Sequence, residues 1–114
     1  MLNPILLAEL MSFRLERDWG QFHDPRNLSA ALAIEASELQ EIFLWVKDAE
    51  ITSRVDARKI AIEQEIADIA IVLSYLCSDL NIDINEAVRK KLEINRLKYP
   101  IDKSRGSSKK YDEL

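Results

Sequence analysis

Glycine, proline and cysteine are scarce in this sequence. Its 114 residues include two glycines, three prolines, one cysteine and one histidine, and 7% of them are aromatic. So few turn-forming residues argue against a β-sandwich or barrel and favour a helical domain. A single cysteine, Cys77, excludes an intrachain disulfide and a cysteine-cluster zinc site. We expect it to be a small buried apolar residue.

Long apolar runs and an excess of positive charge are also absent. No run approaches the roughly 18 residues that a membrane span needs, and the opening MLNPILLAEL lacks the basic region of a signal peptide. Sixteen Lys and Arg against twenty Asp and Glu give a net charge of −4, which argues against a surface that coats nucleic acid. We therefore expect a cytoplasmic domain with no membrane and no nucleic-acid polymer as partner.

Helical periodicity covers most of the chain. The expected helices span residues 3–18, 27–47, 56–80 and 83–99, with a short connection over 48–55. Asn3 followed by proline, Asn27, and Asp83 are the expected N-caps, and Pro25 prevents the first helix from continuing. Four helices with short connections predict an all-α, four-helix-bundle-like protomer. We expect this protomer to form a single domain over residues 1–100, followed over residues 101–114 by a polar basic tail that is mobile unless a ligand or partner orders it.

Two of these helices repeat one acidic pattern at an offset of 30 residues. Glu35 and Glu38 border the apolar stripe of the 27–47 helix, and Glu65 and Asp68 border that of the 56–80 helix at the same helical phase. If the two helices pack together, four carboxylates meet beside one seam. Such a cluster must shift its pKa values, pair with cations or bind a metal.

An all-oxygen cluster favours a hard cation, Mg²⁺ with Mn²⁺ as a substitute, over zinc. A ferritin-type di-iron site is disfavoured because the only histidine, His23, lies outside both helices. The alternative is that each acidic pair is a solvated helix flank. Glu41 lies near the outer edge of its helix and fits either interpretation.

The pattern EASELQE from Glu35 followed by EIAD from Glu65 resembles the MazG-like all-α nucleoside triphosphate pyrophosphohydrolases. The likeness extends through RDWGQFHDPRNL, FLWVKDAE, KLEINRLKYP and SRGSSKKY, and so covers most of the chain. Within that superfamily the chain is most similar to the dCTP pyrophosphatase branch. The resemblance implies Mg²⁺-dependent hydrolysis of a dNTP to the monophosphate and pyrophosphate, with a role in cleansing the nucleotide pool.

The resemblance also implies roles for individual residues. The catalytic and metal-binding set is Glu35, Glu38, Glu65 and Asp68. The substrate-binding set is Trp19, His23, Trp45, Lys91, Asn95, Arg96 and Tyr99, in which the two tryptophans sandwich the base. The further tail contacts are Arg105, Lys109 and Lys110. Each has a simpler alternative: core packing for Trp45, an exposed loop for His23, a solvated helix end for Lys91 and its neighbours, an ion pair for Arg96, and solubility for the tail.

The resemblance further implies a tetramer built as a dimer of dimers, in which the N-terminal segment reaches a neighbouring subunit's active site. A polar groove in a chain this short leaves little apolar core, which independently favours an oligomer. Two other functions stay open from the sequence: a non-catalytic helical adaptor whose acids bind a basic partner, and a metal-binding bundle.

Overall fold

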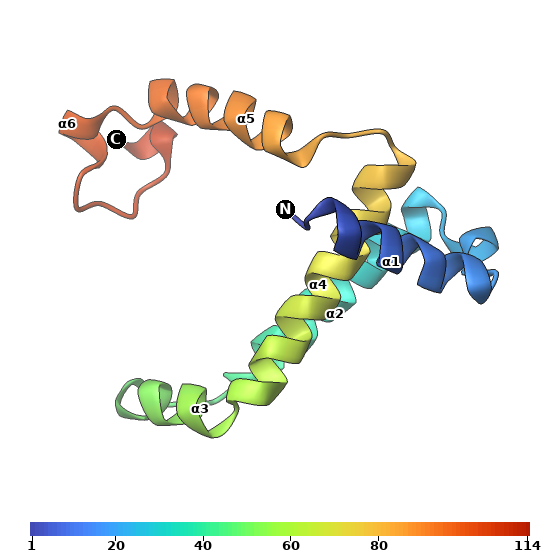
Figure 1. Ribbon diagram of the computed structural model, residues 1–114. Helices are drawn as coiled ribbons and strands as arrows, with labels where there is room; N and C mark the ends of the chain where they lie inside the picture. Colours follow the sequence, from blue (N-terminus) through green and yellow to red (C-terminus); the bar gives the residue numbers. More distant parts are fainter. The chain divides into compact units, whose positions relative to one another are not determined.

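The computed structural model describes residues 1–114 and contains helices and turns but no strand (Figure 1). The predicted all-α class is therefore confirmed. The chain divides into two units, residues 2–81 and residues 82–114, with Met1 grouped with the second. Packing of the last long helix into a four-helix bundle stays a prediction, because that helix belongs to the second unit. None of the helices combines the length and apolarity needed to cross a membrane.

Helix α1 spans Pro4–Glu16 and begins as predicted. The side chain of Asn3 accepts a hydrogen bond from the backbone N–H of Leu6 at 2.8 Å, and proline occupies the first helical position, where its missing N–H costs nothing. The helix ends before the predicted Asp18. That residue adopts φ 53°, and the chain continues as the short 3₁₀ helix η1, Trp19–Phe22.

Helix α2 spans Pro25–Ile42, and the predictions for both its ends were wrong. The N-cap is Asp24, whose side chain accepts from the backbone N–H of Asn27, so Pro25 opens this helix. The helix stops short of Lys47. The chain turns at residues 43–45, and Trp45 adopts φ 64°.

The predicted connection over residues 48–55 is largely helical, a second correction. It contains the 3₁₀ helix η2, Asp48–Glu50, and most of helix α3, Ile51–Ala57. Arg58, at φ −116° and ψ 23°, separates α3 from helix α4, Lys59–Asp79. The third predicted helix is therefore two helices that meet at one non-helical residue.

Helices α2 and α4 lie side by side and run in opposite directions, while α1 packs on α4 (Figure 1). The buried apolar side chains of this unit are Leu28, Ile42 and Tyr75. The Tyr75 hydroxyl donates to the backbone carbonyl of Leu10 at 3.1 Å and so fixes α1 to α4. Large apolar side chains elsewhere are open to solvent, such as Leu15 at 81% exposure. A single chain thus buries only a small core.

The second unit begins with helix α5, Ile84–Lys98, capped as predicted by Asp83, whose side chain accepts from the N–H groups of residues 85 and 86. The predicted polar tail contains two helical turns, α6 over Ile101–Ser104 and η3 over Tyr111–Glu113. The ring of Tyr111 packs edge-on against Tyr99, with centroids 6.2 Å apart, and the Lys98 ammonium lies 4.6 Å from the Tyr111 centroid. These contacts hold the end of the chain against the end of α5.

Candidate functional site

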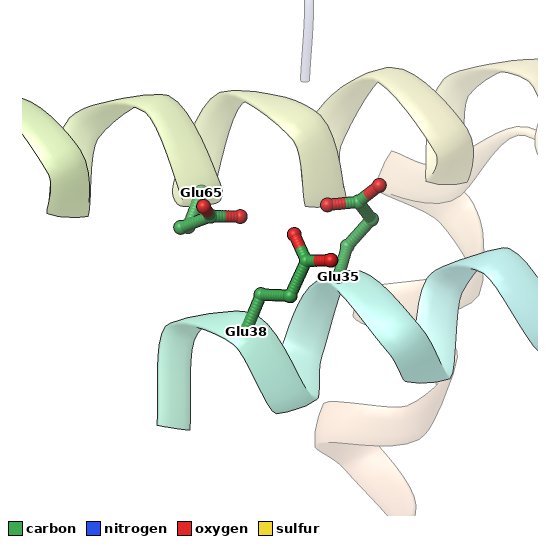
Figure 2. Close-up of side chains that lie close together, drawn as sticks. All are labelled: Glu35, Glu38 and Glu65. Carbon is green, nitrogen blue, oxygen red and sulfur yellow. The ribbon is translucent and has the colours of Figure 1, made fainter. Parts of the chain in front are cut away.

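Three of the four predicted acids converge where α2 faces α4. Glu35 and Glu38 extend from α2 and Glu65 extends from α4, with one carboxylate oxygen of each within 4.8 Å of the others (Figure 2). The antiparallel packing of the two helices produces this meeting, because each acid lies beside the apolar stripe of its own helix. Asp68 lies one turn further along α4 and lines a cavity together with Glu35.

The charged forms of these carboxylates are disfavoured by burial and by their mutual repulsion. Oε2 of Glu35 and Oε2 of Glu65 are buried, and neither has a hydrogen-bond partner. Burial, followed by the neighbouring charges of Glu38 and Asp68, raises the pKa of Glu35 above its ordinary value. Burial and then Glu38 also raise the pKa of Glu65. Buried carboxylate oxygens without donors require a cation or a proton.

These residues fit a hard divalent cation. Every donor atom is a carboxylate oxygen, the ligand type that Mg²⁺ and Mn²⁺ prefer. The two unpartnered oxygens of Glu35 and Glu65 lie where such an ion would supply the missing positive charge. With such a cation bound, the site would place positive charge beside a bound anion.

A cavity of about 420 Å³ adjoins two of these acids. Glu35 and Asp68 line it together with apolar side chains and three residues of the segment between α1 and the start of α2: Trp19, His23 and Asn27. Trp19 is 44% exposed and stands edge-on to Phe13, with ring centroids 5.6 Å apart. An aromatic face beside carboxylates that can hold a divalent cation suits a ligand with a flat ring and an anionic part.

The groups that support His23 could not be predicted from local sequence patterns. Arg14 donates two hydrogen bonds to Asp79, at 2.8 and 2.7 Å, and its guanidinium lies 4.6 Å from the centroid of Tyr75. The His23 ring lies 5.2 Å from the same tyrosine, and its Nδ1 is 3.5 Å from Nη1 of Arg14. Burial, then the charge of Arg14, lowers the pKa of His23, and the charge of Asp79 raises it less. His23 is therefore held at the cavity as part of a network.

A second, more polar cavity of about 450 Å³ opens beside the cluster. It is lined by Glu38, Glu41, Ile42, Arg58 and Glu65. Glu41 thus faces the acidic site rather than the far side of α2. Arg58 is the only cationic side chain on this cavity and forms no ion pair within the chain.

Trp45 does not line the cavity of Trp19. Its side chain is 90% exposed, so core packing is excluded within a single chain. Cys77, expected to be buried, is half-buried instead.

The remaining predicted site residues belong to the second unit. Lys91 and Asn95 follow one another at a four-residue step along α5, Lys91 exposed and Asn95 half-buried. Arg96 is paired with Glu93, as its alternative anticipated. Tyr99 forms the C-cap of α5, donating its N–H to the Asn95 carbonyl at 2.8 Å. The tail cations Arg105, Lys109 and Lys110 are exposed.

The chain is similar to known proteins in both sequence and structure. The family model described as MazG-like family matches residues 30–114. The dCTP pyrophosphatase 1 proteins of Rattus norvegicus and Homo sapiens are each 42% identical to this chain over 104 residues, which is 90% of this chain and 61% of either relative. The chain thus spans about three fifths of the length of these curated relatives.

A solved structure is similar over a larger share of its own length. A pyrophosphatase from Archaeoglobus fulgidus superposes with a TM-score of 0.81 at 43% sequence identity. The match covers 83% of this chain and 89% of that one. At this identity and coverage the likeness includes both fold and sequence.

Proposed function

This chain belongs to the MazG-like family, and on that premise we propose that it is a Mg²⁺-dependent pyrophosphohydrolase that cleaves dCTP, and modified dCTP or other dNTPs, to the monophosphate and pyrophosphate. The similarity to two dCTP pyrophosphatases and to an archaeal pyrophosphatase supports the reaction type. The observation that carries the proposal is the meeting of Glu35, Glu38 and Glu65, with two buried carboxylate oxygens that no group of the chain satisfies.

In this proposal Glu35, Glu38, Glu65 and Asp68 hold the metal. When bound, Mg²⁺ (or Mn²⁺) would neutralise the triphosphate and make the α-phosphorus a better electrophile. Water then attacks that phosphorus, its oxygen forms the new P–O bond, and the bond to the oxygen bridging the α- and β-phosphates breaks. Pyrophosphate leaves with that electron pair, and one carboxylate of the cluster accepts the proton of the water.

The cavity beside Glu35 and Asp68 is the proposed base site. Trp19 offers a stacking face, worth about 1–3 kcal/mol for a nucleobase, and His23 supplies a polar contact in the same cavity. We propose that Trp45 completes the base site and that Lys91, Asn95, Arg96 and Tyr99 grip the phosphates and sugar, as the family resemblance implies. We propose that the domain comprises residues 1–100, and that Arg105, Lys109 and Lys110 of the tail, residues 101–114, add further contacts to the triphosphate.

We also propose that the enzyme is a dimer of dimers that acts on the dNTP pool of the cytoplasm. The small core of a single chain supports association, since Leu15, Ile5 and Ile60 are each more than 70% exposed. Burying large apolar side chains of this kind is worth about 1.5–3 kcal/mol apiece. Chains of this length also leave a larger share of their surface unburied.

A nucleotide panel tests the function. The purified chain is incubated with each common dNTP and NTP and with 5-methyl-dCTP, with and without Mg²⁺, and the products are separated. Mg²⁺-dependent release of dCMP and pyrophosphate is the expected result. Release of dCDP and orthophosphate would mean attack at the wrong phosphorus and overturn the proposal. Absence of turnover with every nucleotide would also overturn the proposal. It would favour a non-catalytic adaptor, or a metal-binding bundle if the chain still bound Mn²⁺.

Two variants locate the chemistry. Glu38→Gln is expected to lower turnover by about 10²–10³-fold or more, because it removes one of the charges that hold the metal. Glu63→Gln is the matched control, since Glu63 is an exposed acid on the same helix as Glu65 and lines neither cavity. Equal loss in both variants would show that the cluster has no special role.

A further inference from the structure

Two polar side chains in the cavity of Trp19 have hydrogen-bonding roles that the chain itself fixes. They are Asn27, at the start of α2, and His23, just before it. An amide or an imidazole left free can present either a donor or an acceptor to a ligand. Here each side chain is restricted to one of those roles.

Asn27 presents an acceptor. Its Nδ2 donates to the backbone carbonyl of Phe22 at 2.8 Å. Because a carbonyl oxygen can only accept, the amide nitrogen must be the atom that faces it. The other amide atom, Oδ1, receives no hydrogen bond from the chain. Asp24 caps α2, so the Asn27 side chain is not needed as a cap.

His23 presents a donor. Its Nδ1 faces Nη1 of Arg14 at 3.5 Å, and a guanidinium can only donate. Nδ1 is therefore the unprotonated nitrogen and Nε2 carries the hydrogen. Asp79 holds the guanidinium in place through two hydrogen bonds. Burial and the charge of Arg14 lower the pKa of His23, which keeps the ring neutral at physiological pH.

An acceptor and a donor in one cavity match one class of nucleobase. Cytosine carries a 4-amino donor next to the acceptors N3 and O2, whereas uracil and thymine carry an O4 acceptor next to an N3–H donor. Building on the proposed function, we propose that Oδ1 of Asn27 accepts the 4-amino group of cytosine and that Nε2–H of His23 donates to its N3 or O2. The pair selects amino-bearing bases over oxo-bearing ones. Adenine has the same pattern, so size separates it from cytosine.

Removing one atom group from the substrate tests the Asn27 contact without altering the protein. The probe is the 2′-deoxynucleoside triphosphate of pyrimidin-2-one, which is dCTP without its 4-amino group. For the unmodified chain we expect kcat/KM to be about tenfold lower for this analogue than for dCTP, the value of one lost hydrogen bond. Equal kcat/KM for the two substrates would overturn the inference.

Variants of Asn27 then separate recognition from structure. Asn27→Leu removes the acceptor and should remove the tenfold preference for dCTP over the analogue. Asn27→Asp also loses the bond to Phe22 but keeps an acceptor oxygen, so it should retain the preference. A purely structural role predicts the same change in both variants. Gln40→Leu is the matched control, because it removes an exposed amide on α2 that does not line the cavity.

The His23 contact has its own readout. His23→Phe should lower kcat/KM for dCTP about tenfold while the effect of the 4-amino group stays unchanged. No loss for dCTP would overturn this half of the inference. Failure of the inference is distinct from failure of the proposed function. A chain that hydrolyses no dNTP with Mg²⁺ contradicts the function, whereas one that hydrolyses dCTP and dUTP equally contradicts only the base selection.

Discussion

Arg14 on α1 and Asp79 at the end of α4 form a two-pronged ion pair, with N–O distances of 2.8 and 2.7 Å. The Arg14 side chain is only 12% exposed and that of Asp79 is 30% exposed. The guanidinium also stacks over Tyr75, which is 4% exposed. This pair therefore joins α1 to α4 and, through His23, reaches the cavity.

Asp79→Asn should destabilise the unit formed by residues 2–81. Breaking a half-buried, charge-assisted pair leaves Arg14 without its partner, and we expect a loss of about 1–3 kcal/mol in the free energy of unfolding. Urea denaturation followed by circular dichroism measures it. Arg89→Gln breaks an exposed pair with Glu86 on α5 and should cost no more than about 0.5 kcal/mol.

The effect of Asp79→Asn should also depend on pH. The hydrogen bonds from Arg14 hold the pKa of Asp79 below its ordinary value of 3.8. A lowered carboxyl pKa gives stability that is present above pH 3.8 and is lost as the pH falls through the folded-state pKa. The difference in the free energy of unfolding between the unmodified protein and Asp79→Asn should therefore become smaller at acidic pH. A difference that stays constant down to pH 2 would contradict this assignment.

His23 can be observed alone, because the chain has no other histidine. Arg14, Tyr75 and Asp79 are the titratable groups that face it. Titration of its Cε1–H resonance by NMR should give a pKa below the ordinary 6.5. Arg14→Gln should raise that pKa by removing a positive charge, and Asp79→Asn should lower it further.

Arg54→Gln serves as the control for this titration, since Arg54 lies on α3 and faces none of these groups. It should leave the His23 pKa unchanged. A His23 pKa at or above 6.5 in the unmodified protein would show that the ring is free in solvent and not held beside Arg14.

Metal removal should change the stability of the acidic cluster. The pKa values of Glu35 and Glu65 are raised by burial, so the protonated acids favour the folded state below about pH 4.5. That contribution is lost as the pH rises through their raised folded-state values. In EDTA the melting temperature should therefore fall from mildly acidic to neutral pH. Mn²⁺ at neutral pH should restore it by mass action.

Glu38→Gln should separate stability from activity at the same cluster. Without metal it removes a like charge beside Glu35 and Glu65, so its melting temperature should equal or exceed that of the unmodified protein. The rise in the melting temperature of Glu38→Gln on addition of Mn²⁺ should be much smaller than that of the unmodified protein. Glu63→Gln should respond to Mn²⁺ as the unmodified protein does. A full Mn²⁺ response in Glu38→Gln would place the cation elsewhere.

Features set by local sequence could be predicted. The caps at Asn3 and Asp83 depend on side chains that bond backbone groups two or three residues away. The convergence of Glu35 with Glu65 needed only helical phase, the repeat and one assumption, that the two helices pack together. The N-cap at Asp24 could also have been predicted from the sequence, because a proline at the first helical position places the cap at the residue immediately before it.

Features set by tertiary packing could not be predicted. Arg14 and Asp79 are 65 residues apart, and their pairing depends on where α1 crosses α4. The end of α2 at Ile42 could not be predicted, because the apolar periodicity of the sequence continues through residues 43–46, beyond the end of the helix. The acceptor role of Asn27 depends on a contact with the Phe22 carbonyl, which exists only once η1 has formed.

Trp45 combines backbone strain with an exposed ring, and its replacement should improve stability at the expense of activity. A bulky residue at φ 64° is strained by about 1 kcal/mol relative to glycine, and at 90% exposure the ring adds no packing within the chain. Trp45→Gly should therefore raise the free energy of unfolding by about 1 kcal/mol. Loss of a stacking face should lower kcat/KM for dCTP about tenfold or more.

Trp45→Ala provides the comparison, because it removes the ring but leaves a side chain at the same positive φ. It should lose activity as Trp45→Gly does without the gain in stability. Urea unfolding and dCTP kinetics on the two variants therefore report separately on the backbone and on the ring. If both variants keep full activity, Trp45 has no part in the base site, and its strained conformation needs another cause. If both lose stability alike, the ring packs against a second copy of the chain.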